Sequence, residues 1–235
     1  MIGTVIQKLN NELPATVRLV AVSKFHPFES IEQAYQAGQR IFAESRPQEL
    51  LAKVKRLEEI RVERGDAAYL SDIEWHFIGH LQTNKLKMVL PYVSLVQSVD
   101  SRRLLDALET WASANEKVVS VLLEPHVAAE ETKQGFVSDE IYEILRSHVG
   151  PEHAYQHVRF CGLMGMATFT DDISVIRSDF SAIRAIFDAC RSSFPEIAEG
   201  FNELSIGMSD DYPIAINHGS TMVRIGSMIF GERNC

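Results

Sequence analysis

The chain has 235 residues, a formal net charge of −9 at pH 7 and 46% hydrophobic residues. This size and apolar content allow a full core, in one large α/β domain or two small ones. The acidic balance, without a long run of Lys and Arg, argues against a nucleic-acid partner. No segment is long and apolar enough for a membrane helix, and the N-terminus lacks the pattern of an export signal. We therefore expect a cytoplasmic protein that binds neither nucleic acid nor membrane.

Cysteines and histidines do not show the spacings of a disulfide framework or a metal site. Cys161, Cys190 and Cys235 include no C-x-x-C pair, which favours reduced thiols over disulfides or a zinc knuckle. His76 and His80 have the four-residue separation of paired metal ligands on a helix, but their segment is typical of a strand that runs into a loop. Their side chains then need not converge, and we expect no metal site.

Apolar, strand-like runs alternate with amphipathic helical segments along the chain. Gly38 suits the end of one helix, Pro47 suits the start of the next, and Pro91 stops a third. The lysines and glutamates of the helix at 47–64 are predicted to form its solvated face. The expected helices span about 4–13, 28–37, 47–64, 82–90, 101–114, 138–148, 173–191 and 210–217, and the expected strands about 18–23, 40–43, 74–79, 95–99, 118–123, 158–164, 201–205 and 221–225.

This alternation predicts an α/β fold. Length and strand number match one closed barrel with almost nothing left over, which favours a single (β/α)8 TIM barrel over residues 1–235 rather than an open doubly wound sheet. In such a barrel the active site forms at the C-terminal ends of the strands. The residues at these predicted ends are Ser23-Lys24, Glu44-Ser45, Gly79-His80, Ser98, Glu124, Met164, Ser205 and Arg224.

The first strand, Arg18-Leu19-Val20-Ala21-Val22-Ser23, is an apolar run that stops at Lys24. An amine at the mouth of a packed strand loses water on one side, which disfavours the ammonium form and makes a nucleophilic neutral amine accessible. Schiff-base chemistry with a carbonyl compound is the use that this position suggests. The alternative is a solvated lysine that merely ends a strand.

Small residues follow the last two strands, where barrels often bind phosphate through backbone N–H groups. The candidates are Ser205, Ser209, Gly226 and Ser227, because glycine lets an oxyanion approach the backbone and serine adds a hydroxyl. Two aspartates directly after Ser209 count against an anion there. We therefore favour Ser205, Gly226 and Ser227 as the phosphate cradle. The alternative is a pair of ordinary strand-to-helix turns, with Ser209 as a helix N-cap.

Lys24 and a phosphate cradle together indicate an aldehyde that also carries a phosphate, for which pyridoxal 5′-phosphate is the natural candidate. Arg224 could then meet the pyridine nitrogen, where a permanent cation would keep that nitrogen unprotonated. The alternative for Arg224 is an ion pair with a carboxylate such as that of Glu203.

The residues singled out above lie in motifs that resemble a known family. The sequence is similar to the pyridoxal-phosphate homeostasis proteins, the YggS/PROSC family, in order from Lys24 to Gly231 and above all at 204–211 and 219–226. The matching motifs are Val22-Ser23-Lys24, Trp75-His76-Phe77-Ile78-Gly79-His80-Leu81-Gln82-Thr83-Asn84-Lys85, Gly162-Leu163-Met164, Leu204-Ser205-Ile206-Gly207-Met208-Ser209-Asp210-Asp211 and Gly219-Ser220-Thr221-Met222-Val223-Arg224-Ile225-Gly226.

The resemblance implies a pyridoxal-phosphate aldimine on Lys24, phosphate contacts from Ser205, Gly226 and Ser227, and Arg224 near the ring nitrogen. It also implies a barrel similar to that of alanine racemase and the ornithine decarboxylase group, the fold type III of pyridoxal-phosphate proteins. The racemases and decarboxylases carry a second, β-rich domain. We expect this chain to lack that C-terminal β-domain.

The chain departs from the family pattern at two places. Ser45 stands where members usually have an asparagine near the cofactor, which puts that contact in doubt. Pro125-His126 stand where the family tends to carry another asparagine, although the lysine and glycine further along this loop, Lys133 and Gly135, are kept. Lys133 is either a second cofactor amine or a solvated loop lysine.

The expected function is that of a carrier rather than an enzyme. With no second domain and no obvious tyrosine or cysteine facing Lys24, two-sided proton transfer lacks one of its catalysts. We expect no catalytic residue, a monomer, and pyridoxal-phosphate-dependent apo-enzymes as recipients of the cofactor. One alternative is a weak pyridoxal-phosphate-dependent racemase or lyase with Lys24 alone as base. A second is an aldolase-type barrel that uses Lys24 on a phosphorylated sugar.

Overall fold

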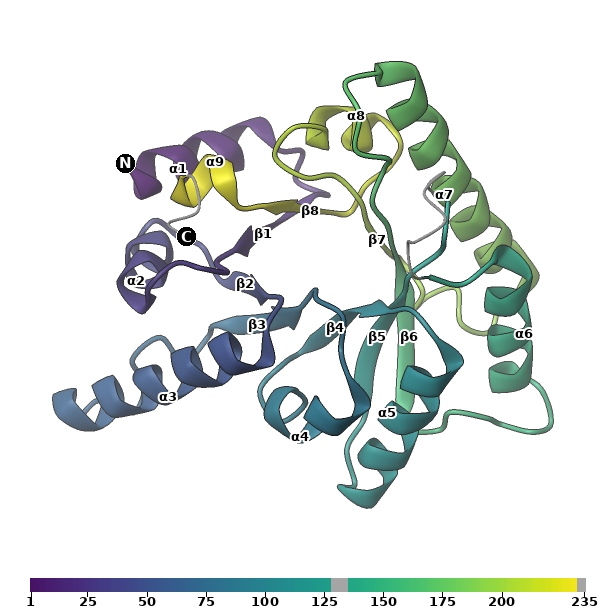
Figure 1. Cartoon of the computed structure of the whole chain (residues 1–235), viewed down its shortest axis with the longest axis horizontal. Coiled ribbons are helices and arrows are strands. Elements are labelled where there is room, and N and C mark those ends of the chain that lie inside the picture. The colour runs from purple at the N-terminus through teal and green to yellow at the C-terminus, as the bar shows by residue number, and fades with distance from the viewer. Residues whose placement is uncertain (128–134, 232–235) are drawn as a thin grey trace.

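The structure, a computed structural model, describes residues 1–127 and 135–231. All its strand pairs are parallel, and the strands β1 to β8 close into a barrel in sequence order, with β8 paired to β1. The helices lie around the outside of this barrel (Figure 1). The predicted single (β/α)8 barrel is therefore confirmed. Lys133, the loop lysine considered above, lies outside the described residues.

The strands begin and end within two residues of the positions expected from the sequence. Several are buried along their whole length, as in β2, β4 and β8, because the barrel interior covers one face and the helices cover the other. The bounds are β1 (Arg18–Val22), β2 (Ile41–Glu44), β3 (Glu74–Phe77), β4 (Leu95–Val99), β5 (Val119–Leu123), β6 (Val158–Met164), β7 (Glu203–Ser205) and β8 (Met222–Ile225).

The helices follow the expected pattern except at two places. The helix expected at 82–90 is split into a 3-10 turn, η1 (Thr83–Lys85), and a short α4 (Leu86–Val89), and α9 (Ser227–Phe230) was not expected, being too short to show a helical period. Within residues 1–127 and 135–231, no helix is long and apolar enough to cross a membrane. The other helices are α1 (Ile2–Glu12), α2 (Phe28–Gln36), α3 (Pro47–Arg64), α5 (Arg102–Ala114), α6 (Ser138–Val149), α7 (Ile173–Ser193) and α8 (Tyr212–Asn217).

The core has an inner and an outer part. Side chains of alternating strand positions fill the barrel interior, while the residues between them belong to a larger cluster that joins the strands to the helices. Trp75 and Phe77 are buried in this outer cluster, which confirms the interpretation of them as core residues. The inner cluster consists of Val20, Val22, Ile41, Ala43, Leu95, Leu122, Met164 and Met222.

Gly162 marks a close approach of two neighbouring strands. It lies in β6 with a φ of +149°, and a Cβ at this position would lie 1.8 Å from the carbonyl oxygen of Glu203 in β7. Gly38, at the end of α2, also has a positive φ (+100°), but a Cβ there would have nothing within 4 Å. An alanine at position 38 would therefore meet only the backbone strain of a positive φ, whereas an alanine at position 162 would meet both that strain and a steric collision.

We expect Gly162→Ala to lower the free energy of unfolding by more than about 3 kcal/mol, because the collision adds to the strain of a positive φ. Gly38→Ala carries the strain alone and is expected to cost about 1 kcal/mol. Urea unfolding of both variants, followed by circular dichroism, measures the difference. Equal losses in the two variants would contradict this account of β6 and β7.

Candidate functional site

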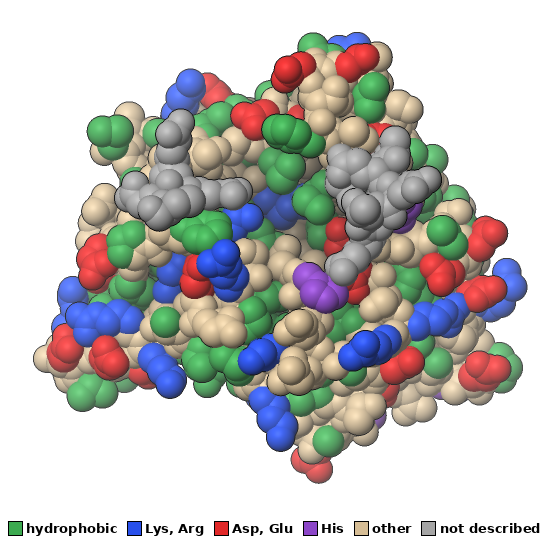
Figure 2. Space-filling model, viewed as in Figure 1, with side chains coloured by type: hydrophobic (Ala, Val, Ile, Leu, Met, Phe, Trp, Pro, Cys, Tyr) green, Lys and Arg blue, Asp and Glu red, His purple; other side chains and the backbone are tan. Residues whose placement is uncertain are grey.

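Two basic residues follow the inward-facing positions of adjacent strands. In β1, Val20 and Val22 belong to the inner cluster, and Lys24 comes two positions after Val22. In β8, Met222 belongs to the same cluster, and Arg224 comes two positions later. Because side chains alternate along a strand, Arg224 points into the barrel, and Lys24 lies in the turn that follows β1, two residues after the inward-facing Val22. Figure 2 shows Lys and Arg side chains at the hollow near the centre of the molecule.

Arg224 is held deep in the barrel by neutral oxygen atoms. Its side chain is buried, and Nη1 donates to the carbonyl oxygen and the hydroxyl of Ser205, both at 2.7 Å. Nη2 donates to the carbonyl oxygen of Gly165 at 2.9 Å. Burial lowers the pKa of Arg224 to about 10, against the opposing effect of the Glu124 and Asp211 carboxylates. The guanidinium nevertheless stays protonated at neutral pH.

These bonds leave part of the guanidinium available to a ligand. A guanidinium has five N–H donors, and within residues 1–127 and 135–231 its hydrogen bonds to Ser205 and Gly165 use three of them. The other N–H groups of Arg224 could donate to a ligand that supplies an acceptor.

A chain of polar groups extends from Arg224 across the interior to β3. The Ser205 hydroxyl donates to Gln97 Oε1 at 2.7 Å, and the Gln97 amide nitrogen lies 2.8 Å from His76 Nδ1. Gln97 must donate in the second contact, so His76 Nδ1 accepts and its ring is neutral. Burial lowers the pKa of His76 to about 3, with a smaller contribution from Arg18. Gln97 was not among the expected site residues, because a glutamine inside a strand carries no motif of its own.

Arg224 does not form the ion pair with Glu203 that was considered as its alternative role. Glu203 instead pairs with Arg18 and accepts a hydrogen bond from the Thr221 hydroxyl. Residue 203 is two positions before Ser205, at the start of β7, and Arg18 begins β1. That interpretation is wrong because the two residues lie at different levels of the barrel: Arg224 pairs in register with Val20, beyond the level of Arg18.

The residues expected to bind phosphate fall into two groups. Ser209, Gly226 and Ser227 meet after β7 and β8, where the Ser227 hydroxyl donates to the Ser209 hydroxyl at 3.1 Å in an exposed position. Ser205 is completely buried, and its hydroxyl is bonded to Gln97 and Arg224. The geometry thus brings Ser209, Gly226 and Ser227 together near the surface, whereas Ser205 lies in the buried interior.

The acidic residues after Ser209 oppose an anion less than the sequence suggests. Asp211 is buried, and its Oδ1 accepts the backbone N–H of Met208. Burial raises the pKa of the Asp211 carboxyl. Because this carboxylate is turned into its own loop, the loop exposes one of the two charges, that of Asp210.

Behind Lys24, on the outer side of β1, lies a buried ionic cluster. The Ser23 hydroxyl donates to Glu44 Oε1 at 2.6 Å, and Lys53 Nζ contacts both that carboxylate and the Ser23 carbonyl oxygen, the latter at 2.7 Å. The Glu44 side chain is fully buried and that of Lys53 is 8% exposed. Burial raises the pKa of Glu44, although Lys53 and Ser23 act in the opposite direction. The expectation that all lysines of α3 are solvated is therefore wrong for Lys53.

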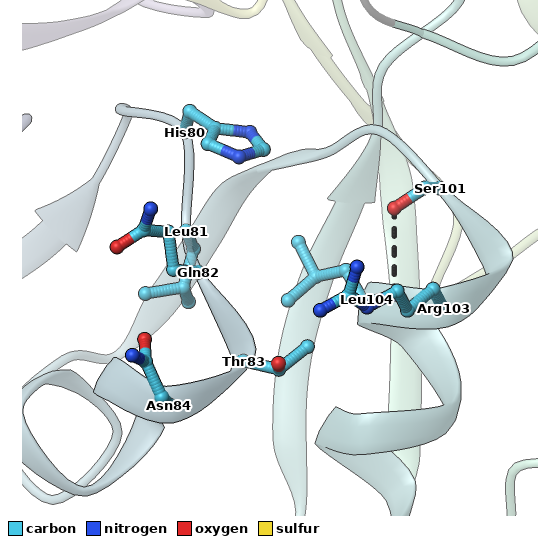
Figure 3. A pocket seen from close by; sticks show the side chains of 8 residues that line it. All are labelled: His80, Leu81, Gln82, Thr83, Asn84, Ser101, Arg103 and Leu104. Atoms are coloured by element: carbon cyan, nitrogen blue, oxygen red, sulfur yellow. Dashed lines mark hydrogen bonds between the residues drawn. The ribbon is translucent and has the colours of Figure 1, made fainter.

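His76 and His80 do not converge. His76 points into the barrel towards Gln97, whereas His80 Nδ1 lies 2.8 Å from Asp100 Oδ2. His80 borders a cavity of about 340 Å³ between the β3–η1 loop and the start of α5, into which Arg103 also projects (Figure 3). Across the described part of the chain, no group of three or more His, Cys, Asp or Glu side chains could hold a metal ion.

Comparison with known proteins places the chain in a family. The family model for the N-terminal domain of alanine racemase matches residues 4–234. A pyridoxal phosphate homeostasis protein from Haemophilus influenzae is 35% identical over 227 residues, which cover 97% of this chain and 90% of that protein. The chain belongs to the pyridoxal phosphate homeostasis protein family. The human family member is 36% identical over 229 residues, covering 95% of this chain and 79% of the human protein.

Solved structures agree with this assignment. PipY of Synechococcus elongatus, solved without and with pyridoxal phosphate, superposes with TM-scores of 0.86 and 0.82 at 31% and 30% identity, over 98% of this chain and 100% of PipY. Alanine racemase of Corynebacterium glutamicum has a TM-score of 0.68 at 14% identity, over 100% of this chain and 61% of the racemase. The second likeness confirms the alanine-racemase-like barrel and says nothing of activity.

The buried His76 makes the stability of this family member sensitive to acid. Its pKa is lowered from 6.5 to about 3 in the folded protein. As the pH falls below 6.5, this histidine becomes protonated in the unfolded chain but not in the folded protein, which lowers the free energy of unfolding. Between pH 6.5 and pH 5 the loss from this residue is about 2 kcal/mol. Urea unfolding at pH 6.5 and at pH 5 measures the free energy of unfolding of the wild type and of His76→Asn, whose amide oxygen can still accept from Gln97. We expect the decrease between the two pH values to be about 2 kcal/mol smaller in His76→Asn than in the wild type. An identical loss in both proteins would contradict a neutral, buried His76.

Proposed function

We propose that residues 1–235 form a pyridoxal 5′-phosphate-binding domain that holds the cofactor covalently through Lys24 and supplies it to apo-enzymes. Three findings support this proposal. The chain belongs to a family of pyridoxal phosphate homeostasis proteins, PipY has been solved with the cofactor bound, and Lys24 and the Ser209–Ser227 pair follow the adjacent strands β1, β7 and β8, with Arg224 inside β8. In this proposal the protein acts as a monomer in the cytoplasm.

The observation that carries the proposal is Arg224. It is a buried cation bonded to oxygens of Ser205 and Gly165, and these bonds use three of the five N–H donors of a guanidinium. An unprotonated pyridine nitrogen could accept from one of the others. Because an arginine stays charged, it would keep that nitrogen unprotonated and make the ring a poorer electron sink. This environment suits a protein that stores the cofactor rather than one that uses it for carbanion chemistry.

The phosphate is assigned to Ser209, Gly226 and Ser227. The two serine hydroxyls already lie 3.1 Å apart, so one anion could accept from both. Gly226 lies against β1, where an added Cβ would be 3.2 Å from the Val22 carbonyl oxygen. We give Ser205 a different role from the one expected from the sequence, because its hydroxyl already bonds Gln97 and Arg224 and thus orients the guanidinium.

The bound cofactor supplies a reactive aldehyde and an aromatic ring that can accept electrons. Lys24 would hold the cofactor through its amine nitrogen, which would replace the aldehyde oxygen, lost as water. Arg224 orients the ring from deeper in the barrel, since it pairs in register with Val20, four residues before Lys24. The apolar side chains of the inner cluster exclude water below the site. These residues bind and retain the cofactor, and none is assigned a proton transfer to an amino acid.

We expect the protein mixed with pyridoxal 5′-phosphate to show the visible absorption band of a lysine-linked cofactor, which borohydride fixes covalently. Lys24→Ala should lose both the band and the fixation, because the bond is made at that amine. Lys8→Ala is the matched control, since Lys8 is 72% exposed on α1. No band in the wild-type protein would contradict the cofactor assignment and favour an aldolase-type use of Lys24.

Transfer separates a carrier from an enzyme. The loaded protein should restore activity to a pyridoxal-phosphate-dependent apo-enzyme and leave a panel of amino acids unchanged. Racemisation or cleavage of an amino acid that is lost in Lys24→Ala would contradict the carrier role and identify a racemase or lyase.

A further inference from the structure

Helix α3 contacts the backbone on both sides of Lys24. Glu49 Oε2 accepts the backbone N–H of Phe25 at 2.9 Å, and Lys53 Nζ donates to the backbone carbonyl oxygen of Ser23 at 2.7 Å. Glu49 and Lys53 are four residues apart and therefore lie on the same face of the helix. One helix face thus holds the residue before Lys24 and the residue after it. We call these two contacts the α3 clamp.

The Lys53 half of the clamp is itself fixed. Its ammonium group pairs with Glu44, the last residue of β2, and the same carboxylate accepts the Ser23 hydroxyl. Both side chains are buried, so water does not compete for these contacts. Ser23 is therefore held through its carbonyl oxygen and its hydroxyl at once.

The Glu49 half of the clamp holds a strained residue. Phe25 has a φ of +67°, in the left-handed region that an aromatic residue rarely adopts. Such a conformation persists where surrounding contacts fix it. The Glu49 contact to the Phe25 N–H is one of these, and the Arg46 guanidinium over the Phe25 ring, 4.5 Å from its centre, is another.

We propose that Glu49 and Lys53 are positioning residues, which hold the amine of Lys24 towards the mouth of the barrel and so slow the release of the cofactor. Lys24 immediately follows β1, and fixing the backbone at Ser23 and Phe25 fixes the direction in which its side chain leaves the chain. The inference rests on the proposed function in so far as the ligand is pyridoxal 5′-phosphate. The clamp itself is independent of the ligand.

The clamp is not what attaches α3 to the barrel. Leu50, Leu57 and Ile60 of the helix are buried in the outer core and provide that attachment. Phe25 and Glu49 also line a cavity of about 580 Å³, so water can replace the carboxylate at the Phe25 N–H. A Glu49 variant is therefore expected to fold.

The first test compares three variants of the full chain loaded with pyridoxal 5′-phosphate. On dilution, Glu49→Ala should lose the cofactor about tenfold faster than the wild type, the effect of one hydrogen bond to a charged group. Glu49→Gln should approach the wild-type rate, because its amide oxygen can accept the same N–H. Glu59→Ala is the matched control, since Glu59 lies on α3 and contacts Arg56 at the surface. The melting temperature of each cofactor-free variant should equal that of the wild type.

The second test needs no cofactor. Acetic anhydride labelling of Lys24 in the cofactor-free protein, measured by peptide mass spectrometry against the exposed Lys8, reports how the amine is held. Glu49→Ala should change the ratio of Lys24 to Lys8 labelling at least twofold, and Glu59→Ala should leave it unchanged. A changed ratio in a protein that shows no cofactor band would support the clamp and overturn the proposed ligand.

The Lys53 half is tested without leaving a lone buried charge. Removing Lys53 alone would strand the Glu44 carboxylate, so the double variant Glu44→Gln/Lys53→Met removes both charges together. It should also release the cofactor faster and change Lys24 labelling. If Glu49→Ala melts like the wild type and both its release rate and its Lys24 labelling are unchanged, the clamp is overturned, whatever the double variant shows.

Discussion

The site depends on a positive charge buried in the barrel interior. Arg224 is buried and held through the carbonyl oxygens of Ser205 and Gly165 and the Ser205 hydroxyl. Neutral acceptors orient the guanidinium without neutralising it, so the charge remains to act on whatever binds above it. The cost is desolvation, which also keeps His76 neutral, three hydrogen bonds from Arg224 along the same polar chain.

The two faces of β1 contact different surroundings: the barrel interior on one side and the buried ionic cluster on the other. Its inward-facing Val20 and Val22 precede Lys24, whereas the hydroxyl of Ser23, directly after the strand, meets the buried pair of Glu44 and Lys53. A strand places consecutive side chains on opposite faces. One residue can therefore face a ligand while its neighbour makes the contacts that hold the backbone in place. Lys24 is thus bracketed by backbone contacts that are made outside the barrel.

The fold could be predicted almost completely from the sequence, because strands covered on both faces appear as short apolar runs between helical segments. Gly38 and Pro47 helped to locate the end of α2 and the start of α3. The short α9 and the split before α4 were missed, since three- and four-residue helices show no period.

The site was predicted less completely, because contacts between distant strands leave no trace in local sequence. Lys24 and Arg224 could be found as charged residues at the ends of apolar strands. The burial of Lys53 could not, because its helix has the composition of a solvated one and the lysine is drawn inward by Glu44 of β2. The orientation of Ser205 likewise depends on Gln97, which is 108 residues away in sequence.

The most direct test is a crystal structure of the full chain with pyridoxal 5′-phosphate. The account predicts continuous density from Lys24 to the cofactor, the ring nitrogen within hydrogen-bond distance of Arg224, and the phosphate at Ser209 and Ser227. Ser205 should keep its bonds to Gln97 and Arg224. A cofactor bound elsewhere, or with its ring nitrogen away from Arg224, would contradict the claim that this buried arginine organises the site.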